Sequence, residues 1–428
     1  MQKSLLIKGG RVIDPASGLD DVTDLLLRNG QIAAIGPDRK VADTADETFS
    51  ARGLIVAPGF IDLHVHLREP GQSYKESIMT GTEAAAAGGF TSVCAMPNTA
   101  PVNDSAEVTS WMQSPERGAV VNVFPIAAAT KGSQGTELSD YRALRRAGAV
   151  AVTDDGKPIL EDHIMEEALR LAAKVGFPVI QHAEDTRVTA GASMNAGPVS
   201  FRLGLRGWPN DAESSIVARD IDLARRTRAH LHVAHISTAE ALQAVSRVRH
   251  GGVNVTCEVT PHHFTLIDEN IGEYDTHYKM NPPLRSAEDR EAMIKGLLTG
   301  TIDCIATDHA PHARHEKEVE FDRASFGITG LETALAIALT ELHHKRKMPL
   351  KRIIELFSTN PARIIGLRGR GIIEEGAHAD IAIFNPNAKW KLDVRQSKSR
   401  SRNTPFDGVN FIGRPVATVV AGRLVHAL

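Results

Sequence analysis

Apolar runs of strand length recur along the middle of the chain, and each is followed by a helical or irregular stretch. There are eight: Leu54–Leu67, Phe90–Pro97, Val120–Ala129, Ala149–Asp155, Phe177–His182, His230–Ile236, Val253–Val259 and Ile302–Asp308. Their nearly continuous apolar character is typical of parallel strands buried on both faces. The intervening stretches have helical spacing, as in Ile164, Ala168, Leu171 and Ala172. Eight β–α repeats predict a closed parallel (β/α)8 barrel over residues 56–367.

An open, doubly wound sheet is the alternative arrangement for alternating strands and helices. In that fold a glycine-rich phosphate loop commonly follows the first strand. No such loop follows the first run of this chain. The sequence therefore favours the barrel.

The two ends of the chain have a different pattern, in which short apolar runs are separated by turn residues. Asn29-Gly30 stands between two such runs, which is a strong hairpin signal. Near the other end, Asp380–Phe384 comes directly before Asn385-Pro386. We therefore predict one small β-sandwich domain, formed by residues 1–55 together with 368–428.

Composition and charge narrow the class of protein. Hydrophobic residues make up 42% and charged residues 24% of the chain, and the net charge is −3. That balance is typical of a soluble globular protein and offers no basic field for nucleic acid or an anionic membrane. No apolar stretch approaches the roughly 20 residues that span a bilayer.

The cysteines and the N-terminus point to the cytoplasm. Cys94, Cys257 and Cys304 stand far apart in apolar runs, so we expect them to be buried and reduced. The N-terminus leads directly into Ser4–Lys8, a strand-like run rather than a signal peptide. We therefore predict a cytoplasmic protein.

Polar residues that can carry chemistry stand where the predicted strands end. Five strands end in histidine or aspartate: His64 and His66 on the first, Asp154 and Asp155 on the fourth, His182 on the fifth, His235 on the sixth and Asp308 on the eighth. In a (β/α)8 barrel these ends meet at one face. Because side chains alternate along a strand, the two histidines of the first strand can bind one metal ion together.

This ligand set predicts a metal centre. Imidazole and carboxylate ligands suit zinc, and suit manganese or iron less well. The set exceeds what one four-coordinate ion needs, so it predicts two ions bridged by one carboxylate. Each residue alone has an ordinary explanation: a strand-end histidine is more often a hydrogen-bonded core residue, and Asp308 could cap a helix. Their occurrence together at one end of the strands favours the metal centre.

Four motifs carry a resemblance to a known family. They are Gly-Phe-Ile-Asp-Leu-His-Val-His-Leu-Arg-Glu-Pro-Gly at residues 59–71, Met96–Thr99, Asn281–Arg285 and Ala306–His312. In this order they resemble the signatures of the dihydroorotases, a family of cyclic amidohydrolases. The resemblance covers the barrel and extends into Asp380–Ala382 and the closing strand. It implies zinc-dependent, reversible hydrolysis of dihydroorotate to carbamoyl aspartate in pyrimidine biosynthesis.

One departure separates the chain from many cyclic amidohydrolases. Hydantoinases, allantoinases and the dihydroorotase domains of animal multifunctional proteins place a carboxylated lysine at the end of strand four. This chain has Asp154-Asp155 there, which is similar to the bacterial dihydroorotases that use an aspartate. The family spacing to His182 favours Asp155 as the bridge, although the sequence leaves Asp154 open. Lys157 falls in the following loop, where we expect it to be exposed.

The resemblance also assigns roles. Asp308 is similar to the general base of the family. Arg68 is expected to bind the substrate carboxylate with its planar fork, with Asn98 and His312 as partners and Asn281 as a further ring-binding group. Each of these residues could instead have a purely structural role. Arg68 could form a surface salt bridge, Asn98 could cap a loop, and His312 could lie on a mobile loop.

The sequence is compatible with two other functions. A hydantoinase or allantoinase would use the same cavity for another cyclic ureide, but the strand-four aspartate and Arg68 argue against it. Some dihydroorotase-like chains have lost metal ligands and serve as structural subunits of aspartate transcarbamoylase assemblies, whereas all six ligand positions are filled here. Similar bacterial chains form complexes with aspartate transcarbamoylase, so we expect that partner. The sequence leaves open a homodimer and whether one or two ions are bound.

Overall fold

The alternation of strands and helices builds a closed barrel of parallel strands. The computed structural model of the chain describes residues 3–249 and 251–428. In order around the barrel the strands are β6 (Phe60–Val65), β7 (Phe90–Ala95), β8 (Asn122–Ala128), β9 (Ala151–Thr153), β10 (Val179–Gln181), β13 (Leu231–Val233), β14 (Val255–Val259) and β15 (Cys304–Ile305). His309, beyond β15, forms a parallel bridge with Val65, and the His66 N–H donates to the His309 carbonyl at 2.9 Å. The predicted (β/α)8 barrel is confirmed, and the doubly wound alternative is wrong.

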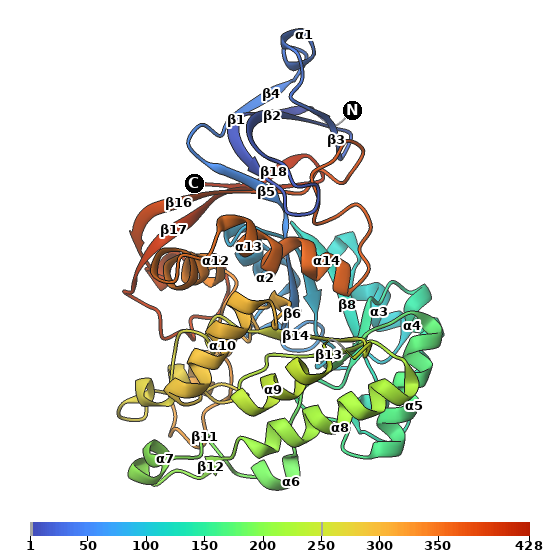
Figure 1. Cartoon of the computed structure of the whole chain (residues 1–428), viewed down its shortest axis with the longest axis vertical. Coiled ribbons are helices and arrows are strands. Elements are labelled where there is room, and N and C mark those ends of the chain that lie inside the picture. The colour runs from blue at the N-terminus through green and yellow to red at the C-terminus, as the bar shows by residue number, and fades with distance from the viewer. Residues whose placement is uncertain (1–2, 250) are drawn as a thin grey trace.

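Helices between the strands cover the outside of the barrel (Figure 1). The longer ones are α2 (Ile78–Ala87), α3 (Ala106–Met112), α4 (Tyr141–Arg146), α5 (Asp162–Val175), α8 (Asp211–Thr227), α9 (Ala239–Val248), α10 (Ala287–Thr299) and α12 (Ala334–Ala338), which continues into the π-helical η5 (Leu339–Lys345). In α5 the predicted stripe buries Ile164, Ala168 and Ala172 and half-buries Leu171. The helix ends before Gly176, whose φ of 83° is the left-handed conformation common at helix ends.

Shorter elements fill the connections. After β10 come α6 (Thr186–Thr189), β11 (Met194–Asn195), α7 (Pro198–Leu203) and β12 (Gly207–Trp208), and after β14 come η3 (Asp268–Ile271) and η4 (Thr276–Tyr278). The remaining short helices are α1 (Arg39–Ala42), η1 (Pro115–Arg117), η2 (Lys131–Ser133), α11 (Arg314–Lys317), α13 (Leu350–Ile354), η6 (Glu355–Thr359), α14 (Asn360–Ile364) and η7 (Val394–Gln396).

Strands from both ends of the chain form a second sheet, where blue and red segments lie together in Figure 1. Its strands are β1 (Leu5–Ile13), β2 (Asp20–Arg28), β3 (Gln31–Ile35), β4 (Glu47–Ser50), β5 (Ile55–Pro58), β16 (Ile381–Lys391), β17 (Asn410–Val420) and β18 (Arg423–Ala427). The predicted hairpin is present, because Asn29 and Gly30 both have positive φ, 52° and 77°, between the paired strands β2 and β3. The division into domains at residues 55 and 368 stays a prediction.

Two local expectations were wrong. The run Leu54–Leu67 is not one strand, because β5 pairs with the terminal sheet while β6 enters the barrel. Gly59 makes the crossing, and a side chain there would overlap Thr91. Asn385-Pro386 does not end its strand either: β16 continues to Lys391 across an irregularity in its pairing with β17, which accommodates the proline.

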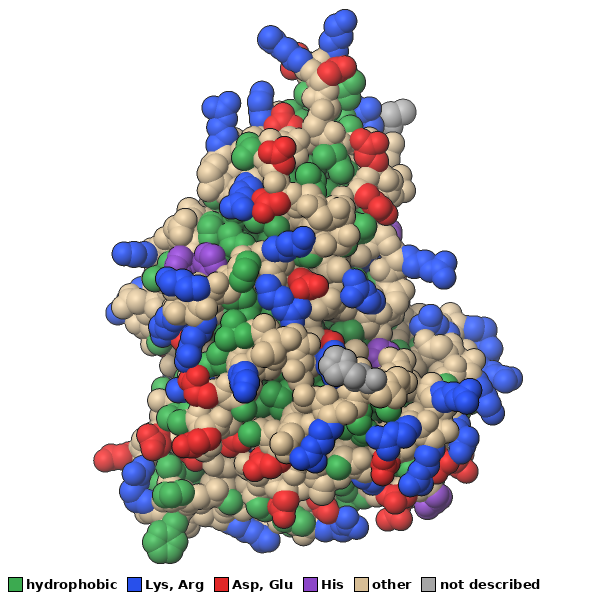
Figure 2. Space-filling model, viewed as in Figure 1, with side chains coloured by type: hydrophobic (Ala, Val, Ile, Leu, Met, Phe, Trp, Pro, Cys, Tyr) green, Lys and Arg blue, Asp and Glu red, His purple; other side chains and the backbone are tan. Residues whose placement is uncertain are grey.

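The distribution of surface charge and the burial of the cysteines are as the composition led us to expect. Charged side chains of both signs are interspersed over the face seen in Figure 2. All three cysteines are free and buried. Across residues 3–249 and 251–428, no helix combines the length and apolar character that crossing a bilayer requires.

Candidate metal centre and active site

A cavity of about 180 Å³ lies where the carboxyl ends of the barrel strands meet, and it has room for one small molecule. It is lined by His66, Arg68, Asn98, Asp155, Gly156, His182, His235, Asn281, Asp308, Ala310, His312, Phe326 and Gly327. The predicted site residues therefore all line one cavity, except His64, which is buried.

Asp155 lies at the centre of a buried cluster of imidazoles. Its Oδ1 is 3.4 Å from His64 Nε2, 3.5 Å from His182 Nδ1 and 3.8 Å from His235 Nε2. Its Oδ2 is 3.6 Å from His66 Nε2. One carboxylate thus faces four histidines through both of its oxygens, which is the geometry that a bridging ligand needs.

Asp308 closes the cluster from the end of the eighth strand. Its Oδ1 is 3.1 Å from His66 Nε2 and 3.5 Å from His64 Nε2. Burial would raise the pKa of Asp308, but the charges of His64 and His66 and the hydrogen bond from His66 lower it to about 2. The carboxylate is therefore ionised, as a ligand or a general base must be.

Three residues of the cavity have backbone angles that side chains rarely adopt. Arg68, His235 and Asp308 have φ of 61°, 30° and 46°. Such left-handed residues cost free energy unless the surrounding structure holds them, and they concentrate at functional sites. All three follow barrel strands within three residues and line the cavity.

Three of the histidines have their second nitrogen held in place. The partners are Glu258 for His64 Nδ1 at 3.0 Å, Asn98 for His66 Nδ1 at 2.8 Å and Glu184 for His182 Nε2 at 2.9 Å. Each acceptor favours a proton on that nitrogen, so the other nitrogen can offer its lone pair to a metal ion when one is bound. Metal-binding histidines are held in this manner.

The cluster fits divalent metal ions. His64 Nε2 is buried and has no hydrogen-bond partner, although two carboxylates lie within 3.5 Å. Burial lowers the pKa of His182, but its interactions with Asp155 and Glu184 outweigh burial and raise that pKa to about 10. The cluster thus attracts positive charge, and ions can replace the protons there. His64, His66 and Asp308 form one group of three ligands, and His64, Asp155 and His235 form another.

The neighbouring aspartate has a different environment. Asp154 accepts hydrogen bonds from the backbone N–H of Thr130 at 3.0 Å and from the Thr130 hydroxyl. Its side chain therefore supports the β8 loop, whereas Asp155 faces the cavity. Lys157 is exposed, as the sequence predicted.

Arg68 and His312 lie side by side on the cavity wall. Arg68 Nε donates to the Pro311 carbonyl at 3.1 Å, and Arg68 Nη2 is 3.3 Å from His312 Nε2. His312 Nε2 is also 2.7 Å from the Phe326 carbonyl. Arg68 is only 8% exposed, and its side-chain hydrogen bonds are with the Pro311 carbonyl and His312. A buried cation of this kind calls for an anionic ligand.

The two asparagines hold metal-site residues as well as facing the cavity. Asn98 donates to Asp155 Oδ2 at 3.2 Å and accepts from His66, so its amide bridges two of the proposed ligands. Asn281 donates to Glu184 at 3.2 Å, and its own Oδ1 is buried without a partner. Asn281 therefore has an acceptor free for a ligand, while Asn98 is occupied by the cluster.

Sequence reasoning missed four residues. Glu258 binds His64 and also His232 at 3.1 Å, and Glu184 binds His182. A lone glutamate within the apolar run Val253–Val259 was the available signal for Glu258. Phe326 and Gly327 also line the cavity, and nothing in the local sequence singled them out.

Replacing Asp155 by alanine should remove at least one metal ion, because both of its oxygens face the cluster. Asp154→Ala should retain more metal, because that side chain bonds to Thr130 instead. Elemental analysis of the two purified variants makes the comparison. Unchanged metal in Asp155→Ala, with loss in Asp154→Ala, would transfer the bridging role to Asp154.

Comparison with known proteins places this arrangement among related enzymes. The family model described as dihydro-orotase-like matches residues 53–241. A protein named dihydroorotase from Solibacter usitatus is 53% identical over 421 residues, which cover 98% of this chain and 97% of that protein. Another of that name, from Anaeromyxobacter sp. strain K, is 47% identical and covers 100% of this chain and 98% of that protein. Among solved structures, the L-hydantoinase of Arthrobacter aurescens superposes with a TM-score of 0.88 at 25% identity, covering 100% of this chain and 98% of that one.

Proposed function

The chain belongs to the dihydroorotase family of cyclic amidohydrolases, and from that premise we propose that it hydrolyses (S)-dihydroorotate reversibly to N-carbamoyl-L-aspartate in pyrimidine biosynthesis. One observation of the site supports this substrate most directly. The buried guanidinium of Arg68 and the imidazole–carboxylate cluster face the same small cavity. A substrate with a carboxylate next to a cyclic amide can engage both.

We propose two zinc ions, held by His64, His66, His182, His235, Asp155 and Asp308, with Asp155 as the bridge. Bound there, the ions would lower the pKa of water and polarise the ring carbonyl. Glu258, Asn98 and Glu184 would keep three of the histidines in the orientation that this requires.

The residues of the chain then orient the substrate and move one proton. Asp308 would accept the proton of the attacking water and pass it to the departing ring nitrogen as the C–N bond breaks. Arg68 would bind the substrate carboxylate in a fork, with His312 beside it, and Asn281 would bind the ring through its free oxygen. Because ring opening creates a carboxylate and releases a proton, acid favours closure and alkali favours hydrolysis.

The test of this proposal is turnover. Purified protein should open dihydroorotate and close carbamoyl aspartate. A hydantoinase would instead prefer hydantoin or dihydrouracil, and a non-catalytic structural subunit would turn over none of these compounds. The Asp155 position and the filled ligand set argue against both alternatives.

Reconstitution with zinc should restore the activity of chelator-treated protein without added bicarbonate. An aspartate already carries two oxygens, so it can bridge without the carbon dioxide that a lysine must capture. Activity measured with and without bicarbonate, in carbon dioxide-free buffer, checks this. A strong dependence on bicarbonate would overturn the role of Asp155.

We also propose a cytoplasmic location, where the three buried cysteines stay reduced, and association with aspartate transcarbamoylase, whose product is the substrate for ring closure. Co-purification of the two proteins at micromolar concentration tests the association. A homodimer is the second arrangement to be distinguished in that experiment.

A further inference from the structure

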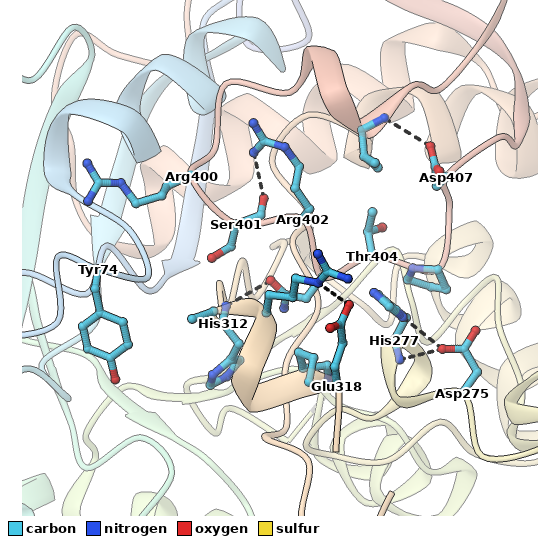
Figure 3. Close-up of a pocket in the computed structure, with 16 residues that line it drawn as sticks. Tyr74, Asp275, His277, His312, Glu318, Arg400, Ser401, Arg402, Thr404 and Asp407 are labelled. Carbon is cyan, nitrogen blue, oxygen red and sulfur yellow. Dashed lines mark hydrogen bonds and ion pairs between the residues drawn. The ribbon is translucent and has the colours of Figure 1, made fainter. Parts of the chain in front are cut away.

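A segment without regular secondary structure, from the C-terminal part of the chain, lies against the wall of the active site. Residues 397–404 lie between η7 and β17. In Figure 3, Arg400, Ser401 and Arg402 of this segment line one pocket with Tyr74, which follows β6, and His312, which follows β15. Ser399 donates to Glu76, and Ser401 donates to the Lys75 carbonyl at 2.7 Å. The inward-facing polar residues of this segment thus bind the barrel at successive points.

Asn403 joins this segment to the cavity wall through its side-chain amide. Its Nδ2 donates to the Ala310 carbonyl at 2.9 Å and to the Gly327 carbonyl at 3.0 Å. Its Oδ1 accepts from the His312 N–H at 3.0 Å. The side chain is 3% exposed, so these three bonds satisfy an amide that has little access to water. All three of its partners line the cavity.

The peptide bond between Pro311 and His312 is held from both sides. Its carbonyl accepts from Arg68 Nε at 3.1 Å, and its N–H donates to Asn403. Asn403 therefore fixes the plane of the peptide against which the guanidinium of Arg68 is oriented. The same amide holds Gly327, so it also fixes the distance between two sides of the cavity.

We propose that Asn403 is a positioning residue, which sets the orientation of Arg68 and His312 toward the substrate carboxylate through the 311–312 peptide. This inference rests on the proposed function, because it assigns the carboxylate-binding role to Arg68. It adds that the C-terminal segment completes a substrate site otherwise built by the barrel.

Asn403→Ala should lower kcat/KM for dihydroorotate by about 10- to 100-fold, mainly through a higher KM, because small misplacements of binding groups have effects of this size. The metal content should stay that of the wild type, because Asn403 contacts no proposed ligand. Asn410→Ala is the matched control, since Asn410 is exposed at the start of β17. Asn403→Asp is the second variant, for use if the alanine variant does not fold. It keeps the shape of the side chain and the oxygen that accepts from His312, but it loses the N–H groups that donate to the Ala310 and Gly327 carbonyls. The KM of this variant should rise as well.

A double-mutant cycle separates positioning from general support of the fold. In an Arg68→Lys background the Nε bond to Pro311 is absent, so Asn403→Ala should raise KM less than threefold further. An equal effect in both backgrounds, or an unchanged KM in the single variants, would overturn the inference. Inactivity of both the wild type and Asn410→Ala on dihydroorotate would instead reject the proposed function.

Discussion

Asp308→Asn is expected to lower kcat for dihydroorotate by about 10²- to 10⁴-fold, the usual contribution of a positioned general base. Asparagine has nearly the same shape but cannot accept the proton of the attacking water. The carboxylate of Asp308 is ionised and lies 3.1 Å from His66 Nε2, so the loss should be one of chemistry more than of folding. Steady-state kinetics of the variant provide the measurement.

Asp308 is also a proposed metal ligand, so the kinetics need a metal measurement beside them. The variant should be assayed at increasing zinc until its metal content matches the wild type. Asp322→Asn, at an exposed position after α11, is the control and should be unaffected. If the zinc-loaded Asp308→Asn variant kept kcat within tenfold of the wild type, the general base would have to be another residue.

Arg68→Met is expected to lower kcat/KM for dihydroorotate by about 10⁴-fold while metal content is unchanged. The wild type should likewise reject dihydrouracil and hydantoin by about 10⁴-fold, because without a carboxylate they leave a buried charge unpaired. The structure supports this size of effect, since Arg68 is buried and its side-chain hydrogen bonds are with the Pro311 carbonyl and His312.

The ratio of kcat/KM values for two substrates tests the role of Arg68 directly. The ratio of kcat/KM for dihydroorotate to that for dihydrouracil should fall in Arg68→Met and stay constant in Arg202→Met, whose arginine is exposed on α7. Equal use of dihydrouracil and dihydroorotate by the wild type would remove the carboxylate-binding role of Arg68. The hydantoinase-like function would then be favoured.

Several features of the site needed only the order of residues. Strand-end positions predicted that His64, His66, His182, His235 and Asp308 come together, because parallel barrel strands all end at one face. The structure does bring them together. The sequence did not decide which of Asp154 and Asp155 faces the cavity. That depends on the direction of the backbone after β9, where Thr130 of another loop binds the side chain of Asp154.

The sequence by itself determined the barrel and the list of chemical groups, because apolar periodicity and residue type are properties of the chain read in order. Only the tertiary structure decided which groups hold others in place. Glu258 and His64 are 194 residues apart, and Asn403 and His312 are 91 apart, yet each pair is joined by one hydrogen bond. Such pairs arise when barrel closure and the docking of the C-terminal segment bring distant backbones together, and no local pattern encodes that distance. The backbone turns at Arg68, His235 and Asp308 were decided in the same way, since the surrounding packing holds angles that these residues would not adopt alone.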